Sequence, residues 1–140
     1  MNTLPSLSSW ITTQLQAWSL ASNVRITETD AFSEDQFSIK LRAQLTEPYQ
    51  LQVRFYFNRG HLDYAYQLFT DVPLLRWDNK EDAGDVATAP HHFHNEEGNI
   101  RESPLNGGPA HDWPLVRVAL EQFLSDWTQS GHSHLVRKIL

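Results

Sequence analysis

Histidine, arginine and aspartate gather in one short segment of this sequence, between residues 76 and 94. The chain has seven histidines, and three of them fall within four consecutive positions, as His91, His92 and His94. Histidine exchanges protons near neutral pH, so this group is suited to general acid–base catalysis. Arg76 lies upstream and can clamp a phosphate through two parallel hydrogen bonds, and Asp78 can orient an imidazole ring. The segment therefore predicts proton transfer on an anionic substrate.

Other interpretations fit the same residues. A histidine-rich loop is often only a solvated polar segment, and Arg76 at the end of a strand often forms a surface ion pair. The spacing of His92 and His94 also occurs among zinc ligands, although the sequence has no H-E-x-x-H motif. Trp77 is more typical of a core or loop anchor than of a platform on which a base stacks.

The elements that must position this segment change period along the chain. Residues 6–21 have apolar side chains at helical spacing, and Ser6 or Ser8 can cap that helix. A second helix is expected from Asp112, which can cap it, to Gly131. Residues 78–112 have little apolar periodicity, so we expect a long loop, and loops of this length are usually functional or disordered.

The middle of the chain alternates between apolar and polar residues, which is typical of half-buried strands. Strands are expected at residues 37–45, 51–57 and 62–69, with two more at 24–29 and 74–77. Short connections favour an antiparallel meander. We therefore expect one α+β domain over residues 1–140, with an N-terminal helix, a four- to five-stranded antiparallel sheet, a long histidine-rich loop and a C-terminal helix.

Both helices are expected to cover one face of this sheet. The opposite face then carries a locally basic and aromatic set of side chains, namely Lys40, Arg42, Arg54, Tyr56 and Arg76. Such a face can hold an RNA backbone electrostatically. A solvated sheet face of no special function is the alternative.

Composition limits the remaining possibilities. The chain has 140 residues, a formal net charge of −6 and no cysteine, which excludes disulfides and thiolate chemistry. The acidic balance argues against a general duplex-DNA binder and fits a protein that docks a basic partner. No apolar run approaches the ~18 residues of a transmembrane helix, and no secretory signal is evident at the start. We therefore expect no membrane association and a cytoplasmic location.

Two runs of this segment together resemble the TumE family of bacterial toxin–antitoxin toxins. The first run is Arg76-Trp77-Asp78-Asn79, and ten residues later comes Pro90-His91-His92-Phe93-His94. The resemblance covers about residues 60–105. Members often carry a further histidine pair just after the first run, where this chain has Lys80, Glu81 and Asp82. If that pair is catalytic in the family, the activity of this chain is altered.

The resemblance implies a toxin of a type II system that is neutralised by a helix-turn-helix antitoxin. It adds Tyr64 and Tyr66 of the upstream strand as substrate-binding residues. It also assigns structural roles to four residues of the motif region, namely Trp77, Asn79, Pro90 and Ser103.

The leading hypothesis is a metal-independent endoribonuclease without a cofactor. In it His91 or His92 is the general base, His94 protonates the leaving oxygen, Arg76 stabilises the phosphorane and Asp78 orients a histidine. RNA or the ribosome as target, and a homodimer as assembly, are further expectations. The alternatives are a non-enzymatic protein-binding domain and a histidine-ligated metal protein.

Overall fold

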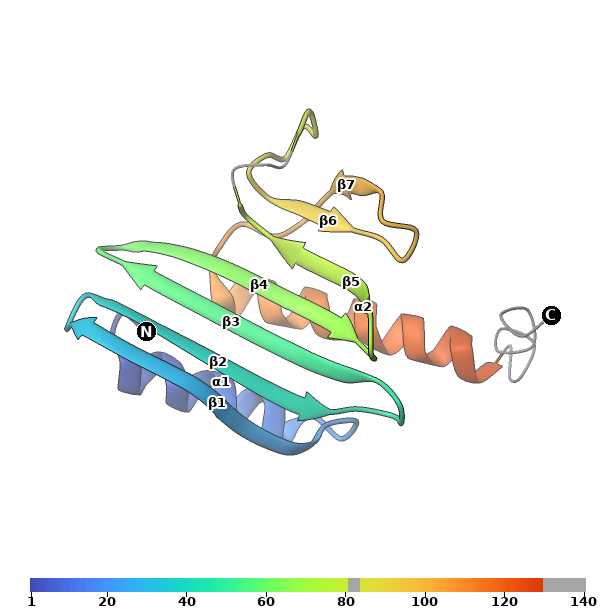
Figure 1. Cartoon of the computed structure of the whole chain (residues 1–140), viewed down its shortest axis with the longest axis horizontal. Coiled ribbons are helices and arrows are strands. Elements are labelled where there is room, and N and C mark those ends of the chain that lie inside the picture. The colour runs from blue at the N-terminus through green and yellow to red at the C-terminus, as the bar shows by residue number, and fades with distance from the viewer. Residues whose placement is uncertain (81–83, 130–140) are drawn as a thin grey trace.

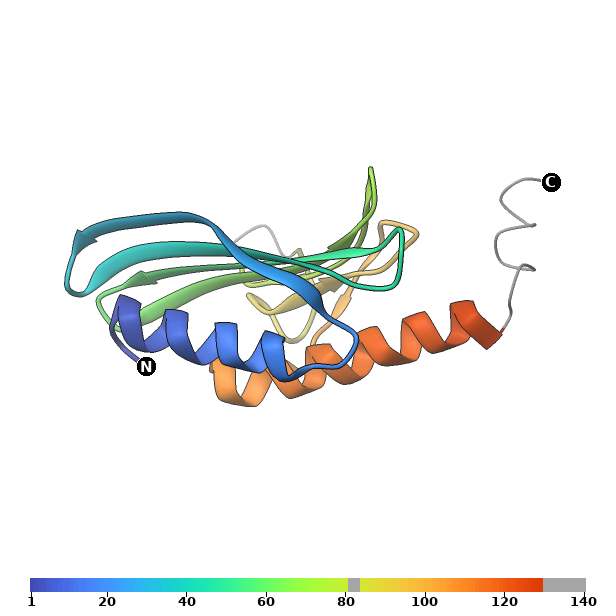
Figure 2. The same cartoon turned by 90° about the horizontal axis from the view of Figure 1, so that it is seen from below.

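The computed structural model of this chain consists of one sheet with two helices on one of its faces (Figures 1 and 2). It describes residues 1–80 and 84–129. The sheet follows the order of the sequence, and each strand pairs antiparallel with the next. The strands are β1 Ser22–Ser33, β2 Gln36–Gln44, β3 Gln50–Asn58, β4 His61–Phe69, β5 Pro73–Asp78, β6 His92–His94 and β7 Ile100–Glu102. The expected α+β architecture, with both helices on one face, is confirmed.

The first helix, α1 (Leu4–Ala17), begins earlier than its apolar pattern indicates. Thr3 is the residue that caps it, because its Oγ1 accepts a hydrogen bond from the backbone N–H of Ser6 at 3.2 Å. The expectation that Ser6 or Ser8 would be the cap is therefore wrong. Trp18 already has extended backbone angles and ends the helix, so the predicted continuation to residue 21 is also wrong.

The second helix, α2 (Pro109–Gln129), also begins before the predicted start. Asp112 lies inside its first turn and is buried. Its carboxylate accepts hydrogen bonds from the backbone amides of Asn106 and Gly107, at 2.9 and 2.8 Å, and so ties the preceding loop to the helix. The predicted C-terminal boundary at Gly131 lies outside the described residues.

Period-two burial explains why the central strands form as expected. In β2 and β3 every second side chain is buried and faces the helices, and the alternate side chains are exposed or half-buried. We call the helix-covered side the inner face and the opposite side the outer face. The largest fully buried side chains of the inner layer include Trp113, Tyr66, Phe37, Phe55, Leu7 and Ile11.

The segment expected to be a long loop instead extends the sheet to seven strands. β6 pairs with the free edge of β5, and β7 pairs with β6. Each has three residues, which is too short to give a recognisable alternation in the sequence. Their position depends on a tertiary contact, because Phe93 packs on Trp77 with ring centroids 4.8 Å apart. Among the helices of the described residues, none is long and apolar enough to cross a membrane.

Candidate functional site

The end of β5 sends alternate side chains to opposite faces of the sheet. Arg76 and Asp78 lie on the outer face, and Trp77 between them is buried among the core residues. In the neighbouring strand, His92 pairs with Asp78 and His94 pairs with Arg76. The antiparallel pairing therefore brings Arg76, Asp78, His92 and His94 together on one face.

Asp78 is the centre of this group. Its Oδ2 accepts a hydrogen bond from Arg76 Nε at 2.7 Å, and its Oδ1 accepts one from the backbone N–H of Lys80 at 3.0 Å. His92 Nε2 lies 3.0 Å from Oδ1, and His94 Nε2 lies 3.5 Å from Oδ2. The arginine is fixed from its other side by Gln67, whose Oε1 accepts from Nη1 at 2.7 Å.

These contacts keep the carboxyl of Asp78 ionised although it is only 2% exposed. Burial by itself raises its pKa, but the hydrogen bonds from Lys80 and Arg76 and the charge of His92 outweigh burial, so the pKa is lowered. A buried carboxylate with such partners acts as a fixed negative charge that orients the histidines beside it.

His92 is enclosed by acceptors. Its Nδ1 lies 2.8 Å from the carbonyl oxygen of Pro90, and its Nε2 faces the carboxylate of Asp78. Because a carbonyl only accepts, Nδ1 carries a hydrogen and donates it to Pro90. The side chain is only 1% exposed. These contacts suit a positioning residue better than the general base of the sequence-based hypothesis.

His94 is the member of the group that reaches solvent. Its side chain is 33% exposed, whereas those of Asp78 and His92 are almost fully buried. Its ring meets that of His92 edge-on, with centroids 4.8 Å apart. Of the histidines on this face, His94 therefore has the position that a substrate can reach.

His91 is separated from this group. Its Nδ1 lies 2.8 Å from the hydroxyl of Tyr64, and the two rings are stacked. Tyr64 and Tyr66 are buried on the inner face, 3% and 0% exposed. Burial, followed by the charges of Asp112 and Asp78, raises the pKa of Tyr64. The expectation that these tyrosines contact substrate does not fit their place in the core, and His91 belongs with them.

The residues expected to be structural have contacts that fit such a role. Asn79 Oδ1 accepts from the backbone N–H of Tyr64, and its Nδ2 donates to the carbonyl of Leu62, both at 2.9 Å. Ser103 is buried, and its Oγ accepts from the backbone N–H of Leu105 at 3.2 Å. Asn79 thus continues the pairing of β4 beyond the last residue of β5.

The remaining candidates lie on the outer face as expected, with different contacts. Lys40 pairs with Glu28 at 3.0 Å. Arg42 donates from Nε to Gln52 at 3.0 Å and covers the ring of Phe69. The hydroxyl of Tyr56 accepts from Gln36 Nε2 at 2.8 Å. Three of these side chains are therefore held along the sheet. Arg54 is exposed, and it pairs with Ala65 of the neighbouring strand β4. On its other side, Ala65 pairs with Asp78 of β5.

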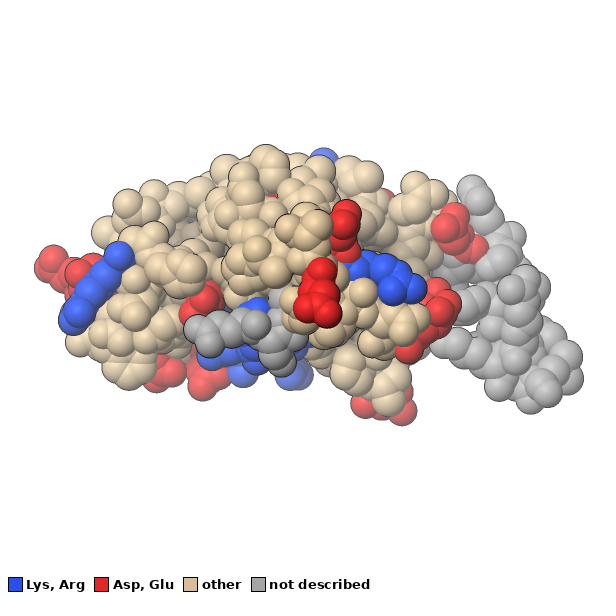
Figure 3. Space-filling model, turned by 90° about the horizontal axis from the view of Figure 1, so that it is seen from above, with Lys and Arg blue, Asp and Glu red and all other residues tan. Residues whose placement is uncertain are grey.

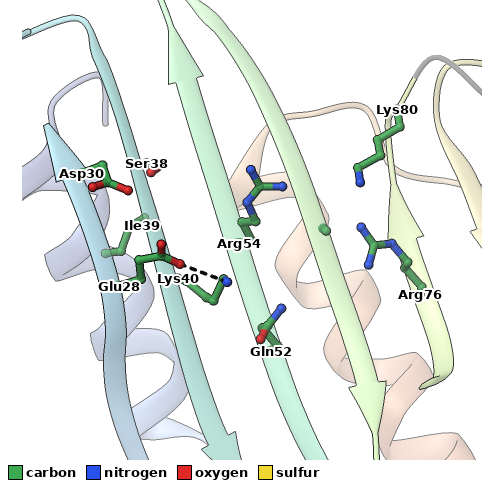
Figure 4. Close-up of a pocket in the computed structure, with 10 residues that line it drawn as sticks. Glu28, Asp30, Ser38, Ile39, Lys40, Gln52, Arg54, Arg76 and Lys80 are labelled. Atoms are coloured by element: carbon green, nitrogen blue, oxygen red, sulfur yellow. Dashed lines mark ion pairs between the residues drawn. The ribbon is translucent and has the colours of Figure 1, made fainter. Parts of the chain in front are cut away.

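Ala65 leaves a hollow of ≈ 400 Å³ in the middle of this face. Arg54, Arg76 and Lys80 extend toward one another around it (Figure 4). Viewed from the β6–β7 edge, a group of lysine and arginine side chains lies on the outer side, with acidic side chains beside it and elsewhere along the molecule (Figure 3). Glu28 and Asp30 of β1 line the same hollow. Sequence reasoning missed Lys80, which looked only like a departure from a family pattern. The hollow could have been predicted from Ala65, because a small residue at an outward position of β4 leaves space on the outer face.

Comparison with known proteins gives one family. A family model described as Toxin TumE matches residues 13–130, which is most of the chain. The match extends well beyond the motif region and includes the whole sheet. No curated protein and no solved structure matches the chain.

Proposed function

The chain belongs to the TumE family of toxins, and from this premise we propose that it cleaves RNA in the hollow over Ala65 on the outer face of its sheet. A toxin of a toxin–antitoxin system has an antitoxin as partner. The observation that carries the proposal is the meeting of Arg54, Arg76 and Lys80 around one hollow, in which Arg76 is also bonded to Asp78, the carboxylate that contacts His94. Guanidinium and ammonium groups are the groups that bind phosphate.

The three cations differ in how they serve a phosphodiester. Arg76 is held by Asp78 and Gln67, so its guanidinium is preorganised and loses little freedom on binding. Arg54 and Lys80 are exposed and, within residues 1–80 and 84–129, form no ion pair. They supply attraction to the RNA backbone, and Arg76 stabilises the charge that develops on the phosphorus-bound oxygens.

Proton transfer falls to His94 in this account. Its ring takes the proton of the ribose 2′-OH while the 2′-oxygen attacks phosphorus, and Asp78 stabilises the imidazolium that forms. The 5′-oxygen leaves and takes a proton from water at the open side of the hollow. The products are a 2′,3′-cyclic phosphate and a free 5′-hydroxyl. The reaction needs only side chains and water. Because its proposed substrate is RNA, the proposed site of action is the cytoplasm.

The antitoxin covers this face in the proposal. A helix-turn-helix antitoxin that blocks the hollow needs an acidic segment opposite Arg54, Arg76 and Lys80. The basic partner suggested by the net charge of −6 suits the β1 side of this hollow, where Glu28 and Asp30 lie, rather than the side of Arg54, Arg76 and Lys80.

A non-enzymatic binding domain is the second candidate, and a specific observation favours it. The contacts of Asn79, His91 and His92 are internal: Asn79 fixes the end of β5 to β4, and the two histidines fix the start of β6 to the sheet. If the motif residues only stabilise the fold, the outer face can serve as a surface that binds another protein. Growth arrest with intact RNA would favour this candidate.

The hollow is tested by replacing the two exposed cations. The double variant Arg54→Ala/Lys80→Ala is expressed under tight induction in a bacterium, beside wild type and Arg101→Ala, an exposed arginine on β7. We expect wild type and the control to arrest growth and fragment total RNA, and the double variant to do neither at an unchanged melting temperature. A double variant that is as toxic as wild type would contradict the proposed place of RNA binding.

A further inference from the structure

Three potential metal ligands converge beside the hollow. One potential ligand atom of each of Asp78, His92 and His94 lies within 4.8 Å of the other two. His92 Nε2 lies 3.0 Å from Asp78 Oδ1, and His94 Nε2 lies 3.5 Å from the other carboxylate oxygen, Oδ2. In a tetrahedral zinc site with bonds of about 2.0–2.1 Å, neighbouring ligand atoms are about 3.3 Å apart. We propose that Asp78, His92 and His94 form a binding site for a divalent transition-metal ion, with Zn²⁺ as its representative.

The atoms around these ligands are arranged as outer partners of a metal site. A metal-ligating histidine usually donates its other ring N–H to a carbonyl or carboxylate, which fixes its tautomer. His92 does so from Nδ1 to the carbonyl of Pro90, and this leaves Nε2 as the coordinating atom. Asp78 is held by Arg76 Nε and the amide of Lys80, so its oxygens are already in place. A carboxylate has about four lone-pair positions, so these hydrogen bonds leave room for a metal.

The donor set selects the class of ion. Two imidazoles and one carboxylate suit zinc and its late first-row neighbours, whereas magnesium and calcium prefer ligand sets made of oxygen atoms. Asp78 and His92 lie below the surface, and His94 is one-third exposed, so an ion enters from the side of His94. The fourth position faces that open side and is taken by water.

Metal binding and the proposed proton transfer exclude each other. An ion on Nε2 of His94 leaves the ring proton on Nδ1, so the neutral ring can no longer take a proton from a 2′-OH. Zinc therefore inhibits the proposed nuclease rather than assisting it. The binding itself does not depend on that function, because it is measured without RNA.

Zinc binding to the untagged full chain, measured by isothermal titration calorimetry, tests the site. The chain also contains His132 and His134, so both are replaced by alanine in every variant to remove their contribution. We expect one Zn²⁺ per chain, and an affinity that falls at least about 10–100-fold in His94→Ala, since loss of even an outer partner costs that much. The control is His61→Ala, an exposed histidine at the start of β4 that already pairs with Asp63.

The two possible failures are distinct. The proposed metal site is wrong if the chain that keeps Asp78, His92 and His94 binds no zinc, or if His94→Ala binds zinc as tightly as the control. Either result would count whatever the outcome of the RNA experiments. If zinc binds as expected but the chain does not cleave RNA, the site stands and the proposed function fails. His94 is partly exposed, so equal melting temperatures of His94→Ala and the control are the check that both variants are folded.

Discussion

The two faces of β5 and β6 use the same motif in different ways. On the outer face, Arg76 lines an open hollow and bonds to Asp78, which in turn contacts His94. On the inner face and at the edge, Trp77, Phe93 and the Tyr64–His91 pair fill the core and hold the loop in place. Residues that are adjacent in sequence therefore have unrelated roles, because a strand sends successive side chains to opposite faces.

This difference teaches that the number of histidines in a segment is a poor guide to the number in a site. His91 and His92 are neighbours, yet one bonds to a core tyrosine and the other to the buried Asp78. Only His94 combines contact with Asp78 and exposure to solvent among the three. The comparison predicts that outer, exposed positions affect activity and that buried positions affect stability, and the following variants test that separation.

The largest expected effect on stability is that of His92→Ala. Removing this fully buried ring leaves a cavity, which costs roughly 2–5 kcal/mol, and takes away one partner of Asp78, although Arg76 remains on it. The measurement is the free energy of unfolding in urea. His94→Ala is the matched control and should cost less than about 1 kcal/mol, because its partly exposed contact is screened by solvent. Equal losses in the two variants would contradict the distinction between a buried and an exposed histidine.

A smaller loss is expected for Asn79→Ala. The substitution leaves the backbone N–H of Tyr64 and the carbonyl of Leu62 without partners, which costs about 1–3 kcal/mol. Asn79→Asp keeps the acceptor but places a second carboxylate oxygen against the carbonyl of Leu62 at a buried position, so it should be at least as destabilising as Asn79→Ala. Thermal unfolding gives the order of the three proteins. If Asn79→Ala is as stable as wild type but not toxic, Asn79 acts in function and not in stability.

The smallest effect is that of Tyr64→Phe. The ring stays in the core, and only the hydrogen bond to His91 is lost, so we expect about 0.5–1.5 kcal/mol of destabilisation. RNA cleavage by the folded variant should be unchanged. Loss of cleavage at an unchanged melting temperature would show that the Tyr64–His91 pair takes part in the reaction.

The sequence predicts those parts of the molecule that repeat a local pattern. β2 and β3 alternate over nine residues each, so their position and the outer placement of Lys40 and Arg54 follow from the period alone. β6 and β7 are three residues long and depend on pairing with β5, which no local pattern encodes.

The same limit explains the candidate site. The motif identifies Arg76, Asp78 and His94, but the division of roles among the histidines depends on strand register. Tyr64 and Tyr66 lie at inward positions of β4. The sequence of the strand could have predicted this, because they fall in step with the apolar residues Leu62 and Leu68. Lys80 enters the site only because the chain leaves β5 beside Ala65.

Cleavage of a defined RNA by the purified chain is the most direct test of the account. Wild type, His94→Ala and the control His61→Ala are compared in metal-free buffer, and the ends of the products are identified. We predict that His94→Ala lowers the rate about 10²–10⁴-fold, the usual contribution of proton transfer by a positioned side chain, and that wild type and His61→Ala give 2′,3′-cyclic phosphate ends. Cleavage by His94→Ala at the wild-type rate, or no cleavage by folded wild type, would contradict the claim that His94 on the outer face performs the chemistry.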